Sequence, residues 1–581
     1  MKIRGKKLVS VILAIAIVIS AFSIPVFANE DVDSKALQVV YTALDKVVNG
    51  LVGGIAAMIK TPNWTRKSNY ETPTTFIEGT GDFISTPAEG AQWKVGYATH
   101  TLLTGNEVGE TCDGDYYVGG SLSVTKKLAT EQWDDQVVRT IAITDGRYLH
   151  IFAVLDAYGM ANTDVRAIRQ QFLNGYKGDM PIGSINISAL HQHSCVDSFG
   201  MNGDLVSALF TSSFKNTFGL EVASGQNKKY MENLYKVTVD SMNNAIADMK
   251  EGTLEFGTAN VEEFIREKRD PIAYDPNINC FKFTPDKEKY PNAKETWITN
   301  AGIHCVGNGA AGTQLTGDYP LYMQRYVEEH DNANLFFILG AELAISDDDH
   351  TRTDDYVGDT TQYENDHAEE WKNDTSFVYN SDTSNIRARG EIIAQKLEKI
   401  DNWETVAPIL NTKYEETWVE IDNNILVLAA KGGLLVNNVC KSGLGYEIVT
   451  EVGYAEFGNS IAVAIIPGEL EAAIAFGVNG EEGGAYPASK YYTNLTDGCE
   501  CPEGFCWNGE EWENDTFQKT VGDKKLLVFG LTNDQVGYLL MNNNWHCIFT
   551  ENEEVVSAGK MAGDSIAKTF NKIASENKTS N

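Results

Sequence analysis

The segment Ser184-Ile185-Asn186-Ile187-Ser188-Ala189-Leu190-His191-Gln192-His193-Ser194 joins an alternating apolar run directly to two histidines. Its first half alternates apolar with small polar residues, and this period of two predicts a half-buried β-strand. Neutral imidazoles are the commonest metal ligands, and a strand end holds side chains more rigidly than a loop does. The segment is therefore a candidate metal site at the end of a strand, although two polar residues leaving a strand would produce the same pattern.

The residues before this strand predict a β-α-β unit. Strands are expected at 137–143 and 148–155, followed by a helix that Asn162 or Thr163 caps. The chain then enters the strand that ends at His191, and such a unit implies parallel pairing. We therefore expect an α/β fold with mixed or largely parallel sheets flanked by helices. In such folds, sites form at the carboxyl ends of the strands.

Later periodic segments extend the same pattern. Helices are expected at 231–249, 319–329, 386–400 and around Ile566, Phe570 and Ile573, and strands at 254–256, 296–303, 335–339, 418–428, 461–466 and 526–529. At 581 residues the chain exceeds the usual size of one hydrophobic core. The predicted organisation is an N-terminal extension at 29–92, with an apolar helical pattern from Leu37 to Ile59, and a main domain at 93–581.

The first 28 residues predict a signal peptide. Four basic residues precede an apolar run at 8–27, and a small-residue cleavage site ends at Ala28. We therefore expect an exported, secreted or cell-surface protein with no membrane span after cleavage. The apolar run is also about long enough for an uncleaved anchor.

Charge and cysteine content restrict the partners. The net charge of −34 disfavours nucleic acid and anionic bilayers as partners. Cys499, Cys501 and Cys506 cluster in a predicted loop at 480–520, where a local disulfide or a second small metal site would explain them. A second predicted loop, at 347–382, is dense in acidic and polar residues, and we expect it to be solvated and to serve as a candidate lid. The sequence does not indicate an oligomeric state.

Three further residues suit the same metal site. His304 and Glu469 each follow a predicted apolar strand, and Tyr538 follows another after a short loop. Two histidines, a carboxylate and one further oxygen suit zinc with an open coordination position.

These residues resemble motifs of the neutral/alkaline non-lysosomal ceramidases, in their catalytic N-terminal domain. The segment ending His191-Gln192-His193-Ser194 looks like the family strand that ends Thr-His-Thr-His-Ser. The other similar segments are Asn300-Ala301-Gly302-Ile303-His304 with Gly317-Asp318-Tyr319-Pro320, then Ile465-Ile466-Pro467-Gly468-Glu469, and finally Asn533-Asp534-Gln535-Val536-Gly537-Tyr538. The motifs occur in the family order across residues 93–560.

The resemblance implies a zinc enzyme that hydrolyses the amide of N-acylsphingosine. It implies that His191, His304, Glu469 and Tyr538 are the zinc ligands. His193 would lie near the scissile amide, and Arg269 would face the developing oxyanion.

The chain also departs from the family pattern. Ser346 falls at the catalytic serine, but the preceding Gly-Asp and the following Pro are missing, and no C-terminal immunoglobulin-like domain is expected. The sequence thus predicts an exported zinc-dependent amide hydrolase acting on N-acylsphingosine or a related lipid amide. The alternatives are an amidase for a non-lipid acyl amide and a metal-holding binding protein with impaired catalysis.

Overall fold

The computed structural model describes residues 35–579, apart from 121–126, 203–214, 216–224, 268, 270–272, 309–311, 344, 347–357, 478–511 and 546–551. The predicted signal peptide, the cysteine cluster at 499–506 and the first part of the acidic loop lie outside the described residues.

Within the described residues, the larger sheet has nine strands in the order β11-β9-β8-β6-β1-β3-β4-β5, with β13 paired to β6. The strands are β1 (Trp93–Thr101), β3 (Val137–Thr144), β4 (Leu149–Leu155), β5 (Ile182–Ala189), β6 (Lys250–Asn260), β8 (Asn277–Pro285), β9 (Thr296–Ala301), β11 (Asn334–Leu339) and β13 (Glu404–Thr405). The β4–β5 and β9–β11 pairs are parallel, and the other pairs are antiparallel.

The second sheet follows the order β14-β16-β17-β19, with β15 paired to β16 and with β17–β19 parallel. Its strands are β14 (Leu410–Glu420), β15 (Val439–Ser442), β16 (Gly445–Phe457), β17 (Ile461–Ile465) and β19 (Lys525–Phe529). Three short pairs complete the strands: β2 (Glu131–Gln132) with β10 (Gln314–Leu315), β7 (Arg266–Glu267) with β12 (Ile345–Ser346), and β18 (Glu469–Leu470) with β20 (Tyr538–Leu539).

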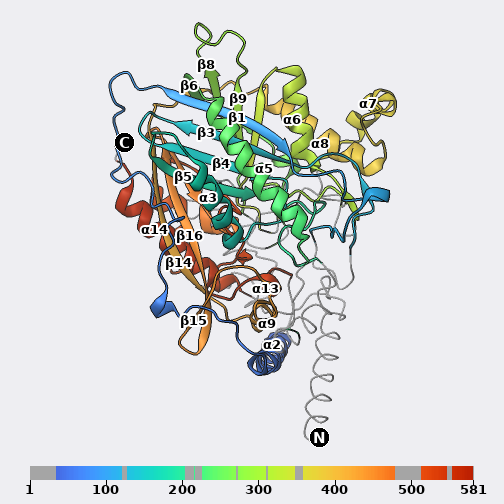
Figure 1. The fold of residues 1–581 in the computed structure, drawn as a ribbon, viewed down its shortest axis with the longest axis vertical. Coiled ribbons are helices and arrows are strands. Elements are labelled where there is room, and N and C mark those ends of the chain that lie inside the picture. The colour runs from blue at the N-terminus through green and yellow to red at the C-terminus, as the bar shows by residue number, and fades with distance from the viewer. Residues whose placement is uncertain are drawn as a thin grey trace, which may run out of the picture.

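The two sheets pack face to face, and helices cover their outer faces (Figure 1). Strand β4 is buried on both faces, which explains its continuous apolar sequence. Ile151 and Ala153 lie in the core beneath α3 (Asn162–Gly175) and α5 (Lys228–Ala247). Phe152 instead contacts Phe529 of the second sheet, with ring centroids 5.9 Å apart. The closing helix α14 (Ala562–Asn577) packs on β14 and β16. These layers confirm the predicted α/β class.

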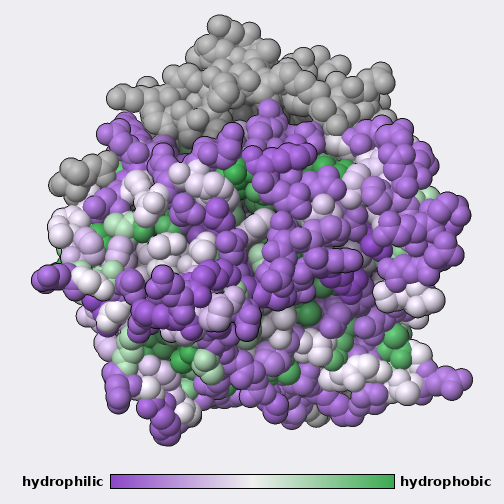
Figure 2. All heavy atoms as spheres, turned by 90° about the horizontal axis from the view of Figure 1, so that it is seen from above, coloured by the Kyte–Doolittle hydropathy of each residue, from purple (hydrophilic) through white to green (hydrophobic). Residues whose placement is uncertain are grey.

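The remaining helices pack around the two sheets. They are α2 (Lys35–Met58) against α9 (Asn424–Gly432), α6 (Asp318–His330) against β11 and α8 (Ser381–Leu397), α7 (Thr361–Asn373) against α8, and the short α10 (Ala472–Phe476), α12 (Phe517–Val521) and α13 (Asn552–Val556). None of the helices in the described ranges is both long enough and apolar enough to cross a bilayer. The face seen in Figure 2 is mostly hydrophilic, with small separate apolar areas.

Three local predictions are wrong. The N-cap of α3 is Ala161, one residue before the expected cap. The strand expected over 418–428 ends at Glu420, because the Asn423 side chain accepts a hydrogen bond from the Ile425 N–H and starts α9.

The third wrong prediction is that of an uninterrupted acidic loop, because residues 361–373 form α7. Tyr363, His367 and Trp371 recur every four residues and stack along one side of this helix. Trp371 is fully buried, and the Arg387 guanidinium lies 4.9 Å from the Trp371 ring. One aromatic stripe is therefore sufficient to dock an otherwise polar helix.

The carboxyl ends of strands from both sheets meet at one place. Asn300, near the end of β9, donates from its side-chain amide to Ile338 O of β11 (3.0 Å) and Val528 O of β19 (2.8 Å). A Cβ on Gly302 would lie 2.2 Å from the Ala341 carbonyl oxygen, so the loops after β9 and β11 approach closely only with glycine there. These contacts bring the segments after β9, β11 and β19 together, and they create the site described next.

Candidate metal centre

His191 and His193 emerge directly from β5. His191 has a φ of 50°, in the left-handed region that non-glycine residues rarely adopt, and this strain marks the exit from the strand. Its Nδ1 lies 2.8 Å from the Tyr158 carbonyl oxygen, and its ring stacks on the Tyr158 ring at 4.6 Å between centroids. Because a carbonyl oxygen only accepts, Nδ1 carries the proton and Nε2 keeps its lone pair.

His304 follows β9 and faces both of these histidines. Its ring centroid lies 4.8 Å from that of His191 and 4.9 Å from that of His193. The His304 Nδ1 lies 2.8 Å from Glu342 Oε2 and 3.1 Å from the Ile345 carbonyl oxygen. Two acceptors thus hold the proton on Nδ1, and the opposite nitrogen, Nε2, lies 3.2 Å from the Nε2 of His193.

Glu469 and Tyr538 enter from the second sheet. They pair directly in the short parallel ladder β18–β20. Glu469 Oε1 accepts a hydrogen bond from Gln535 Nε2 at 2.9 Å, while Oε2 lies 3.4 Å from His191 Nε2. The structure therefore brings together His191, His193, His304, Glu469 and Tyr538 from the ends of strands in two different sheets.

The donor atoms fit a divalent cation. His191 Nε2, Glu469 Oε2 and Glu342 Oε1 are buried and accept no hydrogen bond from the described residues. Two overlapping groups can hold a metal: His191, His193 and His304, and His304, Glu342 and Glu469. Nitrogen and carboxylate oxygen donors of this kind suit zinc, among other divalent metals.

The pKa shifts of these residues also favour a bound cation. Burial and the neighbouring His304 hold the pKa of the His191 imidazole well below its ordinary value, so it is neutral and able to coordinate. Burial and the neighbouring Glu342 raise the pKa of Glu469 well above its ordinary value. Two buried carboxyl groups facing each other are costly without a cation, and a metal ion would remove that cost.

Of the other two predicted residues, Ser346 lies close to this centre in sequence and in space. Its backbone belongs to β12, which pairs with β7, and the preceding residue, Ile345, accepts the bond from His304.

Arg269 is held differently from the sequence expectation. Its Nη2 donates to Glu554 Oε1 at 2.7 Å and to the Asn544 carbonyl oxygen at 2.6 Å. Asn544 Nδ2 in turn donates to Glu471 Oε1 at 2.5 Å, two residues after Glu469. Arg269 therefore joins the centre through Asn544 and Glu471, with its guanidinium already paired to a carboxylate.

Sequence reasoning missed three supporting residues. Glu342 lies in Gly340-Ala341-Glu342, directly after an apolar strand, which is the same signal that identified Glu469. Gln535 lies in the segment that ends at Tyr538, so its neighbourhood was recognised. Tyr158 acts partly through a backbone carbonyl, and a sequence contains no signal for such a contact. Cys195 and Cys305, each beside a predicted ligand, are buried.

The fold of this α/β protein, with its two packed sheets, has counterparts among solved structures. The fold is similar to that of the neutral ceramidase from Pseudomonas aeruginosa, with a TM-score of 0.55 and 14% sequence identity over 84% of this chain and 74% of that chain. A ceramidase complexed with C2 matches with the same TM-score and identity, over 84% and 75% of the two chains. The sequence matches no protein-family model and no curated protein. The fold is thus ceramidase-like.

Proposed function

We propose that this protein is an exported zinc-dependent amide hydrolase whose substrate is N-acylsphingosine or a related acyl amide. The observation that carries the proposal is the convergence of His191 Nε2 and Glu469 Oε2 beside His304, at the strand ends of a ceramidase-like fold; both atoms are buried and make no hydrogen bond to the described residues. Export is proposed from the signal-like N-terminus alone.

In this proposal His191, His304, Glu469 and Tyr538 hold the zinc ion. When bound, zinc supplies a Lewis acid that polarises a carbonyl oxygen and activates water. Tyr158 and Glu342 keep the protons of His191 and His304 on Nδ1, so that both Nε2 atoms are available.

The other residues act on the substrate. His193, with its Nε2 3.2 Å from His304 Nε2, can hold or release a proton beside the scissile amide. Arg269 positions β18 through Asn544 and Glu471, and Ser346 orients the substrate.

The surroundings of Glu469 support an apolar substrate group. Glu469 and Tyr158 border a small cavity of about 30 Å³. Much of its remaining lining is apolar, including Phe199, Met201, Leu426, Leu435, Ile448, Val536 and Val556. At this volume the cavity has room for about one water molecule, so its apolar walls, and not its size, point to a hydrocarbon group near the amide.

The test is hydrolysis of labelled ceramide by the purified full-length chain, before and after chelation and after zinc is added back. We expect fatty-acid release that chelation abolishes and zinc restores. An N-acyl amino acid measured in parallel separates a lipid amidase from one for non-lipid amides. Activity that resists complete removal of the metal would contradict the proposal.

A second candidate is a metal-holding binding protein. The pairing of Arg269 with Glu554 favours it, because that guanidinium is not free to stabilise an oxyanion. Full zinc occupancy without hydrolysis of any acyl amide would support this second candidate.

A further inference from the structure

A separate cavity lies at the opposite end of β9 and β11 from the metal centre. Its volume is about 500 Å³, which is typical of a small-molecule site. Thr296 and Asn334, the first residues of β9 and β11, line it, whereas His304 and Glu342 lie just beyond the last residues of the same strands.

The cavity exists because β6 starts only at Lys250 and so pairs with only the first part of β1. β1 pairs with β6 only from Trp93 to Val95, since β6 starts at Lys250. Beyond that point the Tyr97 N–H donates to Asp248 Oδ2 (3.1 Å) instead of to a strand. The Tyr97 hydroxyl reaches across to the Leu335 carbonyl oxygen of β11 at 3.1 Å. An extended β6 would fill this space. Because β6 begins only at Lys250, the space is empty of protein, and the hydrogen-bonded Tyr97 and Asp248 form its base.

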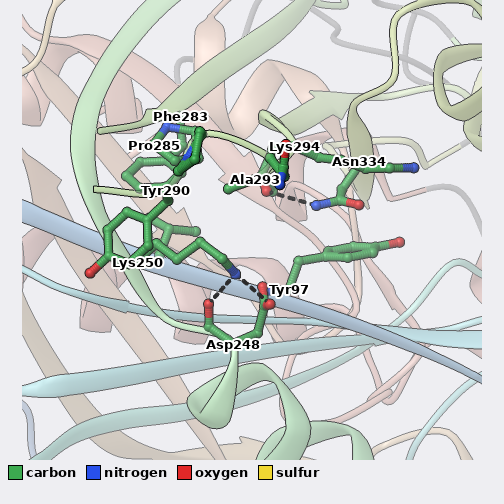
Figure 3. Close-up of a pocket in the computed structure, with 13 residues that line it drawn as sticks. Tyr97, Asp248, Lys250, Phe283, Pro285, Tyr290, Ala293, Lys294 and Asn334 are labelled. Carbon is green, nitrogen blue, oxygen red and sulfur yellow. Dashed lines mark hydrogen bonds and ion pairs between the residues drawn. The ribbon is translucent and has the colours of Figure 1, made fainter. Parts of the chain in front are cut away.

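Charged groups of both signs face this space. Lys250 Nζ donates to Asp248 Oδ1 (2.5 Å) and to the Asp248 carbonyl oxygen (2.7 Å), so its charge is compensated (Figure 3). Lys294 is exposed and makes no ion pair with the described residues. Both cations retain N–H donors, and the Asp248 carboxylate remains an acceptor.

Flat apolar surfaces and side-chain amides complete the lining. Tyr290 lies beside Lys250, and Tyr97 and Asn334 lie across from them (Figure 3). Phe283 and Pro285 add buried apolar surface, and Asn292 adds a second amide at the rim. The site therefore combines aromatic faces with separate donors and acceptors.

We propose that this cavity binds a saccharide unit. A sugar ring presents C–H faces, which suit the negative face of an aromatic ring such as Tyr290, and hydroxyl groups, which pair with both donors and acceptors. An inorganic anion would fill little of 500 Å³ and would meet the Asp248 carboxylate. An acyl chain would desolvate the Lys250–Asp248 pair. This inference does not depend on the proposed amide hydrolysis.

The test is saturation-transfer-difference NMR on the full chain with N,N′-diacetylchitobiose, cellobiose and maltose. Sodium acetate and decanoate are measured separately as anionic and acyl probes. We expect at least one disaccharide to bind, with saturation on the ring C–H protons, and Tyr290→Ala to weaken its binding at least tenfold. Lys294→Ala is expected to weaken it about threefold, since an exposed cation contributes little.

Two controls locate the binding. Tyr379→Ala removes a half-exposed aromatic ring far from the cavity in sequence, and His304→Ala damages only the metal centre; both variants should bind the disaccharide as the parent does. Absence of binding for all three disaccharides would overturn the proposal. So would disaccharide affinity that Tyr290→Ala and Lys294→Ala leave unchanged, or binding of acetate or decanoate alone that Tyr290→Ala weakens.

Discussion

Strands β9 and β11 end at the candidate metal centre and begin at the candidate saccharide cavity, and the two ends satisfy their polar groups differently. At the carboxyl end, His191, His304, Glu342 and Glu469 are buried, and within the described residues His191 Nε2 and Glu469 Oε2 make no hydrogen bond. At the other end, Lys250 and Asp248 neutralise each other and remain partly exposed to water.

This difference shows which end requires a ligand for its own stability. Buried imidazole and carboxylate acceptors without partners are costly, so the carboxyl end is suited to a cation. At the cavity end Lys250 and Asp248 compensate each other and Lys294 is exposed to water, so this end is stable without a ligand and should bind one more weakly. Six residues of β9, about 20 Å of strand, separate the two ends, and variants can therefore affect one end without the other.

The largest effect is expected from removing His304, the residue that belongs to both candidate metal-binding groups. His304→Ala should lower bound zinc from about one per chain to near zero, and should reduce hydrolysis by at least about 10³-fold, because Lewis-acid catalysis is worth several kcal/mol. Elemental analysis and ceramide hydrolysis measure both effects. His330→Ala, at the exposed end of α6, is the matched control. Unchanged zinc content in His304→Ala would remove this residue from the centre.

The next effect concerns Asp134, which supports the loops around the metal centre, and the pH dependence of the protein's stability. Asp134 is buried and accepts hydrogen bonds from the Gly317 N–H, the Thr316 hydroxyl and the Tyr322 hydroxyl. Gly317 O in turn accepts from the Gln192 side chain, between the two histidines of the strand end. Burial raises the pKa of Asp134 to about 6 from its ordinary value of 3.8.

Because this pKa is raised in the folded state, the unfolded chain loses the proton first as the pH rises. Asp134 therefore contributes stability that is full below pH 4 and is lost between pH 4 and 6, by up to about 3 kcal/mol. Asp134→Asn should lack this part of the pH dependence. Urea unfolding of both proteins between pH 4 and 7 measures the difference, and parallel stability curves would refute the assignment.

A smaller effect is expected at the residue behind His304. Glu342→Gln keeps the side-chain volume but removes the negative charge that faces His304 Nδ1, and should weaken zinc binding by about 10–100-fold. Competition with a chromogenic chelator measures the affinity. Glu329→Gln, on the exposed side of α6, is the control and should bind zinc as the parent does. Equal affinities in all three proteins would make Glu342 a structural residue only.

An effect of similar size, on activity but not on bound zinc, is expected at the altered serine motif. Ser346→Ala should keep full zinc and lose about 10–100-fold in activity, since the segment Leu343-Ala344-Ile345 directly before it offers no base to activate its hydroxyl. Ser376→Ala, on an exposed turn, is the control. A covalent acyl-Ser346 adduct detected by mass spectrometry would instead make this serine the nucleophile.

The sequence alone was sufficient where the signal is local. The period-two run before His191 predicted β5, and the apolar runs before His304 and Glu469 predicted β9 and β17. Side chains that leave strands at their carboxyl ends can be recognised one strand at a time. The α/β class follows from the same runs, because strands buried on both faces need layers on both sides.

Tertiary structure alone decided how those strand ends combine. The ladder between Glu469 and Tyr538 and the bond from His304 to Glu342 join segments far apart in the chain. The pairing of Arg269 with Glu554 spans 285 residues, and the cavity beside Lys250 depends on where one strand begins relative to its neighbour. Local periodicity carries no information about such long-range register, because it is set by the packing of whole sheets against each other. The sequence therefore determined which residues could ligate a metal, and the fold decided which of them meet and what holds each in place.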